Sequence, residues 1–240
     1  MAVDERTQRG GRDRRFYTWV AIAIPIIVLL GFARTYYLKG LFAGPPLAGR
    51  LVHLHGIVMT LWVILFIVQV RLVATRRTYL HRRLGVAGGV FAVLVFVVGI
   101  GTGIAAAARG SSPGPPPLQF LVIPLGDMLL FAILVGSALY FRNRLEVHKR
   151  LMLVAAVNLL APAIARIPLQ FIAAGGPLAF FGLTDLCLLA CVAYDTMKNR
   201  RLHRTFIWSI GLVIASQPLR LMLAGTPQWI RFADWLVHLA

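Results

Sequence analysis

The chain has 240 residues, of which 59% are hydrophobic and 14% are charged, and its formal net charge is +17. Its mean hydropathy of +0.78 lies far from that of a soluble domain and predicts an integral membrane protein. The positive charge does not favour nucleic-acid binding, because no basic surface module with interleaved aromatic residues is present.

Seven apolar segments are each long enough to cross a hydrocarbon core of about 30 Å, which takes roughly 20 helical residues. In chain order they cover residues 16–35, 51–74, 84–108, 118–141, 151–174, 177–197 and 205–225. We therefore expect an all-α fold, a polytopic membrane bundle of seven transmembrane helices in residues 16–225. Residues 1–15 are expected to form a disordered basic tail, and residues 226–240 an amphipathic interfacial helix.

The basic residues alternate between the two ends of these segments. Five precede the first segment, five lie between the second and third, and eight lie in the fourth-to-fifth and sixth-to-seventh connections, against five in all the remaining connections and the tail. By the positive-inside rule, the N-terminus is cytoplasmic and the C-terminal helix is outside. The expected location is the bacterial cytoplasmic (inner) membrane, with the lipid bilayer as the first partner.

A weak repeat links the third and fifth segments. The third opens with "HRRLG" at His81 and the fifth with "HKRLM" at His148, each after a descending helix and a short basic turn. The repeat predicts two similar helical hairpins, segments two with three and four with five, that form a four-helix core.

Four charged side chains lie deep inside the predicted spans, one in each of four spans and all in the outer half. A charge near the middle of a span costs roughly 2.5–3.5 kcal/mol, so these residues need partners. We expect a polar cluster that pairs Asp127 or Asp185 with Arg166 and Arg220. The neighbouring members of this cluster are His55, Gln170 and Gln217. The cluster is either a set of staples between helices or the lining of a cavity that binds a small ligand.

The histidines offer two further sites. A b-type haem between helices needs two axial ligands at equal depth on different helices, and His81 and His148, with arginines beside them for the propionates, meet this requirement. His53 and His55 could bind a metal such as copper only if the chain is not yet helical at Leu54. On a regular helix, residues two apart point to nearly opposite sides.

Four stretches, "FARTYYLKGLF", "HLHGIVMTLWVILFIVQVRLVATRRTYLHRRLG", "HKRLMLVAAVNLLAPAIAR" and "SQPLRLMLAGTPQW", resemble a widespread family of bacterial multi-pass membrane proteins. That resemblance covers most of the chain and implies the fold but no established activity. The "HG" before Met59, "HRRLG" and "HKRLM" are also similar to motifs of di-haem b-type membrane cytochromes and of cytochrome oxidase assembly proteins. The di-haem pattern has four helix histidines in two layers, and this chain lacks the second outer one, which leaves one haem.

Three functions are compatible with these features. The first is a non-enzymatic accessory or small-ligand-binding membrane protein built around the outer cluster. The second is a haem-b electron carrier, with a respiratory-chain or other membrane partner. The third is a proton-coupled or metal-ion transporter that uses Asp127, Asp185 and His55. An enzyme is less favoured, because no hydrolase motif and no nucleophile placed beside a histidine is present.

Overall fold

The computed structural model describes the backbone of residues 2–42, 44 and 46–239, and within these ranges the side chains from residue 13 onward. The described residues form helices and no strands, and seven helices are long and apolar enough to cross a membrane. These spans are Asp13–Tyr37, Arg50–Ala74, Thr78–Ala108, Pro117–Tyr140, Leu145–Ile164, Gln170–Asn199 and Arg204–Ala224. The predicted all-α, multi-pass membrane fold is therefore confirmed, whereas the orientation of the termini stays a prediction.

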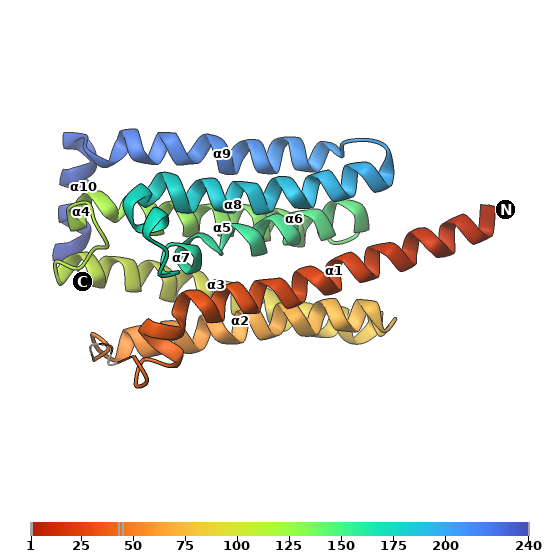
Figure 1. Cartoon of the computed structure of the whole chain (residues 1–240), viewed down its shortest axis with the longest axis horizontal. Coiled ribbons are helices and arrows are strands. Elements are labelled where there is room, and N and C mark those ends of the chain that lie inside the picture. Colours follow the sequence, from red (N-terminus) through yellow and green to blue (C-terminus); the bar gives the residue numbers. More distant parts are fainter. Residues whose placement is uncertain (1, 43, 45, 240) are drawn as a thin grey trace.

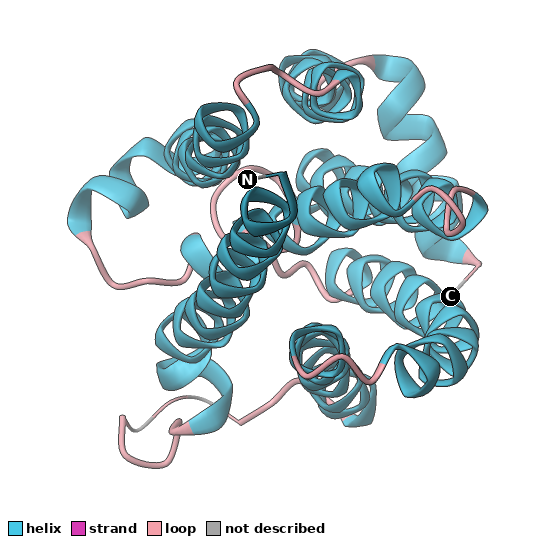
Figure 2. Ribbon diagram, turned by 90° about the vertical axis from the view of Figure 1, so that its right-hand side faces the viewer, coloured by secondary structure: helices cyan, strands magenta, loops and turns pink. Residues whose placement is uncertain are grey.

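The long helices run side by side along one axis (Figure 1) and are seen nearly end-on in Figure 2. They are α1 (Ala2–Phe32), α2 (Arg50–Ala74), α3 (Thr78–Ala108), α5 (Val122–Tyr140), α6 (Leu145–Asn158), α8 (Gln170–Asn199) and α9 (Arg204–Ala224). Helices α2 and α3 pack as one hairpin and α5 and α6 as another, and α3 contacts α5. This arrangement agrees with the two hairpins expected from the repeat, with α1 packed on α2 and α9 on α5 and α6.

Short helical elements close one end of the bundle. They are the π-helix η1 (Ala33–Tyr37), α4 (Pro117–Phe120), α7 (Ala161–Ile164) and α10 (Pro227–His238). Helix α10 lies across the bundle beside α4, at the end opposite the N-terminus (Figure 1). Thr226 caps α10 by accepting from the Trp229 N–H, and the Trp229 indole donates to the Leu118 carbonyl over 2.8 Å. The tail is helical as expected, and its interfacial position stays a prediction. We call the end of the bundle that contains α10 the α10 end, and the opposite end the N-terminal end.

The fifth and sixth segments have different boundaries from those expected. Helix α6 ends at Asn158, and the chain then forms only α7 before it turns into α8 at Gln170. Pro162 and Pro168 explain the difference, because proline lacks a donor N–H and forces the preceding residue out of the helical region. Helix α8 is itself kinked at Gly176, whose φ of +52° favours glycine and which precedes Pro177.

The N-terminal tail also differs from expectation. A disordered tail was predicted for residues 1–15, whereas helix α1 begins at Ala2. The side chain of Asp13 forms ion pairs with Lys149 and Lys198, which ties this part of α1 to α6 and α8. The prediction considered the composition of the tail alone and therefore missed these long-range partners.

Helix α6 occupies the centre of the bundle. Its residues 150, 151 and 153–158 are all buried. These residues cover every side of the helix, whereas a helix at the surface of a bundle buries only one stripe. Leu151 is fully buried, as are Leu134 and Ala138 of α5 and Val95 of α3. A charged group on the buried part of α6, such as Arg150, therefore needs its partner inside the protein.

Candidate functional site

The two histidines of the repeated motif lie together. The rings of His81 at the start of α3 and His148 at the start of α6 have centroids 6.3 Å apart and planes inclined at 76°. They come from the two hairpins, at the N-terminal end of the bundle. This pairing is what the repeat and the requirement for equal depth predicted.

Both rings are held by hydrogen bonds through Nδ1. The Nδ1–H of His148 donates to the Ala138 carbonyl over 2.8 Å, because a carbonyl can only accept, and this leaves Nε2 with its lone pair. The side-chain nitrogen of Gln69 donates to Nδ1 of His81 over 2.6 Å when the amide is oriented so that its oxygen accepts from the Gly85 N–H. His148 is thus in the tautomer that a metal ligand needs, whereas Nδ1 of His81 accepts from Gln69, so the His81 proton is on Nε2 and has to move before that nitrogen can bind a metal.

The outer polar cluster is split into separate pairs. Arg220 of α9 donates to Asp127 of α5 over 2.6 Å and to the Ile123 carbonyl, and both charged residues are buried. Its guanidinium also lies 4.7 Å from the centre of the Phe181 ring. Gly126 makes room for this arginine, since a Cβ there would lie 2.2 Å from Arg220 Cδ. Of the pairings that the sequence analysis left open, Asp127 or Asp185 with Arg166 and Arg220, the structure contains Asp127 with Arg220.

The second aspartate has a neutral partner. Gln217 of α9 donates to Asp185 of α8 over 2.8 Å, which joins two of the predicted cluster members. Gln170 is exposed at the first residue of α8 and does not join them. Its assignment to the fifth segment was wrong, because Pro168 ends that segment earlier.

Arg166 does not pair with either aspartate. It lies in the connection between α7 and α8, donates to the Pro162 carbonyl, and stacks 4.9 Å from the Phe32 ring centre. Among the described side chains, no carboxylate lies within 4.0 Å of it. Its charge acts on His55, whose buried Nδ1 has no hydrogen-bond partner. The expectation that Arg166 forms part of a paired layer was therefore wrong, because the chain leaves the helix before this residue.

The His-x-His pattern does not form a chelating pair. Helix α2 begins at Arg50, so Leu54 is helical and the condition for a copper site is not met. His53 is exposed, and its carbonyl accepts from the Tyr36 hydroxyl, whereas His55 is half-buried. Across the part of the chain that the structure describes, no group of three or more histidine, cysteine or acidic side chains is placed to hold a metal ion.

A buried ion pair at the N-terminal end was missed by the sequence analysis. Arg150, only 2% exposed, donates from Nε and Nη2 to both carboxylate oxygens of Asp195 on α8 over 2.8–3.1 Å. Its Nη1 donates to the carboxylate of Glu146 one turn earlier, and its guanidinium faces the Phe206 ring. Arg150 had been counted as a basic residue of the fourth-to-fifth connection.

Two signals in the sequence could have found this pair. Glu146 and Arg150 have the i, i+4 spacing of a helical ion pair, so the helix could have been started earlier. Asp195 falls within the predicted sixth segment, where a carboxylate needs a partner as much as Asp127 does.

An open cleft of about 450 Å³ lies next to the Arg150–Asp195 pair. It is lined by Asp13, Glu146, Arg150, Lys198, Asn199, Arg201 and His203.

His203 at the edge of this cleft caps helix α9 and should make stability depend on pH. Its Nδ1 accepts from the Thr205 N–H over 3.2 Å, and burial together with the charge of Arg150 lowers the pKa of His203. The unfolded chain takes up a proton near pH 6.5 while the folded chain resists it, so acidification through that pH should reduce the free energy of unfolding by about 1 kcal/mol, the value of a helix cap.

The check on the His203 cap is thermal unfolding in detergent between pH 5 and pH 8. His203→Asn keeps a capping acceptor that does not titrate, so its unfolding midpoint should vary less with pH than that of the wild type. His238→Asn, which changes an exposed histidine at the α10 end, should leave the wild-type profile intact. Equal profiles for the wild type and His203→Asn would contradict the assignment.

Comparison of the chain with models of protein families, with curated proteins and with solved structures found no match. The resemblances described from the sequence therefore stay predictions. The chain is an all-helical protein with seven helices fit to span a membrane.

Proposed function

We propose that this protein is a b-type haem electron carrier of the membrane, with His81 and His148 as the two axial ligands of one iron. The observation that carries the proposal is the 6.3 Å between the two ring centroids. Imidazoles bound to opposite sides of one metal ion have centroids about 6 Å apart, because a metal–nitrogen bond is about 2 Å and a ring nitrogen lies about 1 Å from its centroid.

The surroundings of the rings support the same function. A ligating histidine usually donates its other ring N–H to a carbonyl, which His148 does with Ala138. The ligands stand on two hairpins that contact each other through α3 and α5, so a bound group would be held between helices. A haem held there would supply one-electron transfer. The exposed Arg82 beside His81 is available to a propionate.

The test is an absorption spectrum of protein purified from cells supplied with a haem precursor. The wild type should show a Soret band, and His81→Ala and His148→Ala should each lose it. His203→Ala, which changes a histidine at the same end of the bundle, should retain it. A colourless wild type, or a band that survives both ligand substitutions, would rule out the proposal.

A second candidate function is the binding of a small anion at the α10 end, as an accessory membrane protein. Arg166, without a carboxylate partner among the described side chains, and the unpartnered Nδ1 of His55 favour it. Binding of carboxylate or phosphate compounds, measured by calorimetry, should weaken in Arg166→Gln and persist in Arg109→Gln, an exposed arginine after α3. No such binding by the wild type would remove this candidate.

A further inference from the structure

Two arginines near the start of the first span, Arg14 and Arg15, have no counter-charge among the side chains that the structure describes. Each carboxylate whose side chain the structure describes is engaged elsewhere: Asp13 with Lys149 and Lys198, Asp127 with Arg220, Glu146 with Lys149 and Arg150, Asp185 with Gln217, Asp195 with Arg150, and Asp234 with His238. Arg14 and Arg15 form no ion pair with any of them. No described carboxylate is therefore left to neutralise these arginines, which leaves them available to an anion from outside the chain.

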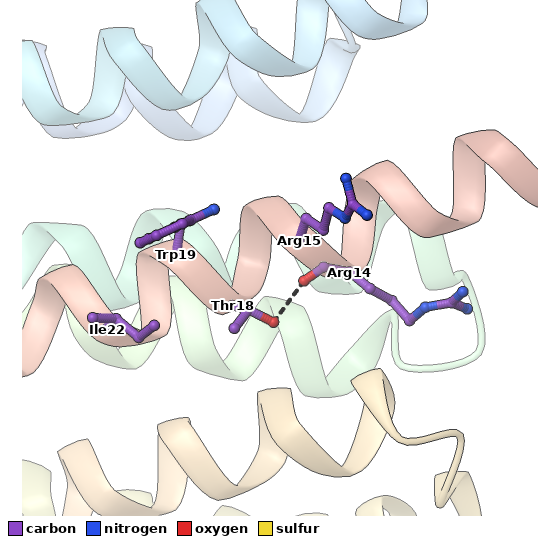
Figure 3. Close-up of a pocket in the computed structure, with 5 residues that line it drawn as sticks. All are labelled: Arg14, Arg15, Thr18, Trp19 and Ile22. Atoms are coloured by element: carbon purple, nitrogen blue, oxygen red, sulfur yellow. Dashed lines mark hydrogen bonds between the residues drawn. The ribbon is translucent and has the colours of Figure 1, made fainter.

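These arginines line a groove on the outward face of α1. The groove, of about 660 Å³, is formed by Arg14, Arg15, Thr18, Trp19 and Ile22. Figure 3 shows these side chains along one stretch of α1, with the indole nitrogen of Trp19 on the side of Arg15. Arg15 and Trp19 are one helical turn apart, so their donors are neighbours on the helix surface. The Trp19 side chain is exposed, and its indole N–H has no acceptor among the described residues.

The groove continues into an apolar stripe. Trp19 is 69% exposed, and Ile22, Ile26 and Leu29 follow at helical spacing with 46–50% of their surface exposed. Charged donors, an amphipathic ring and an aliphatic surface thus succeed one another along the helix axis. This is the order in which a phospholipid presents its phosphate, its ester region and its acyl chain to a helix at the membrane interface.

We propose that an anionic phospholipid binds in this groove as a specific lipid, with its phosphate held by Arg15 and the Trp19 indole N–H and an acyl chain along Ile22, Ile26 and Leu29. Arg14 adds a second positive charge for the headgroup. The Thr18 hydroxyl donates to the Arg14 carbonyl and is not a donor to the lipid. The site lies on the opposite side of α1 from the buried Ala21 and Ile24, so it needs no rearrangement of the bundle.

The experiment is native mass spectrometry of the full chain mixed with dioleoyl phosphatidylglycerol or dioleoyl phosphatidylcholine. The wild type should retain phosphatidylglycerol better than phosphatidylcholine. Arg15→Gln should lower phosphatidylglycerol retention about fivefold, the effect of one lost hydrogen bond to the phosphate. Trp19→Phe keeps the ring and removes the N–H, so it should lower retention in the same direction.

The matched control is Arg83→Gln, which removes an exposed arginine beside an aromatic ring, Tyr79, on α3. It should leave retention unchanged, because no indole donor is present there. Equal retention by the wild type and Arg15→Gln, or an equal loss in Arg83→Gln, would show that only the net charge matters and would overturn the proposal. Glycerol 3-phosphate that competes with the lipid at equal concentration would also overturn it, because the acyl chain would then contribute nothing.

Discussion

Replacement of Arg150 by leucine is expected to lower the free energy of unfolding by about 3–5 kcal/mol, because it leaves Asp195 as a buried carboxylate without its partner. Asp195 is 5% exposed, its carboxylate accepts from two nitrogens of Arg150, and no other described side chain donates to that carboxylate. The measurement is reversible unfolding in detergent micelles, followed by circular dichroism.

The double variant Arg150→Leu/Asp195→Leu tests whether the lost stability comes from the unpaired charge of Asp195. Removal of both charges should recover much of the lost stability, since a buried ion pair replaced by apolar residues is often neutral. Arg142→Leu is the matched control, because this arginine is exposed and donates only to the Leu139 carbonyl. If Arg150→Leu unfolds like the control, the ion pair contributes little to the free energy of unfolding, and the interpretation that Arg150 needs a partner inside the protein is wrong.

Replacement of Arg220 by leucine is expected to have an effect of similar size at the opposite end. It would leave Asp127, 3% exposed, without its 2.6 Å contact and would remove the stacking of the guanidinium on Phe181. The expected loss is again about 3–5 kcal/mol, with partial recovery in Asp127→Leu/Arg220→Leu. The measurement is the same detergent unfolding experiment.

Two further variants separate the ion pair from general packing around Arg220. Gly126→Ala should weaken the same contact without touching a charge, because its Cβ would displace Arg220 Cδ. Arg231→Leu, on the exposed side of α10, should have no comparable effect. A loss of stability in Arg220→Leu that the double variant fails to recover at all would point to packing rather than charge.

The sequence could predict the spans because they depend on local composition. Long apolar runs with basic ends are sufficient to define α2 and α9 to within one residue at each end, whereas α3 begins at Thr78, six residues before the predicted start. The α6–α7–α8 region could not be placed in the same way, because an apolar run does not reveal where two prolines divide it. Arg166 and Gln170 were misplaced for that reason.

The candidate sites were predictable to different degrees. His81 and His148 could be paired from the repeat, since matched motifs on two hairpins that run in the same direction bring equivalent residues to the same depth. A carboxylate partner for Arg220 could be expected because Asp127 and Arg220 both lie inside spans, where a charged side chain needs a partner of opposite charge. Arg150 was missed because its burial depends on the position of α6 in the centre, which is a property of the whole assembly.

The central position of α6 has a consequence for the insertion of the protein during synthesis. The span that contains it has a mean hydropathy of 1.4, the lowest of the seven. It also carries Arg150, whose carboxylate partner lies 45 residues later in the chain. When α6 leaves the ribosome, α8 has not yet been made, so Arg150 enters the membrane region with Glu146 of its own helix as a partner but without Asp195. The α6 segment therefore depends on being kept beside the insertion machinery, or at the lipid surface, until α8 arrives.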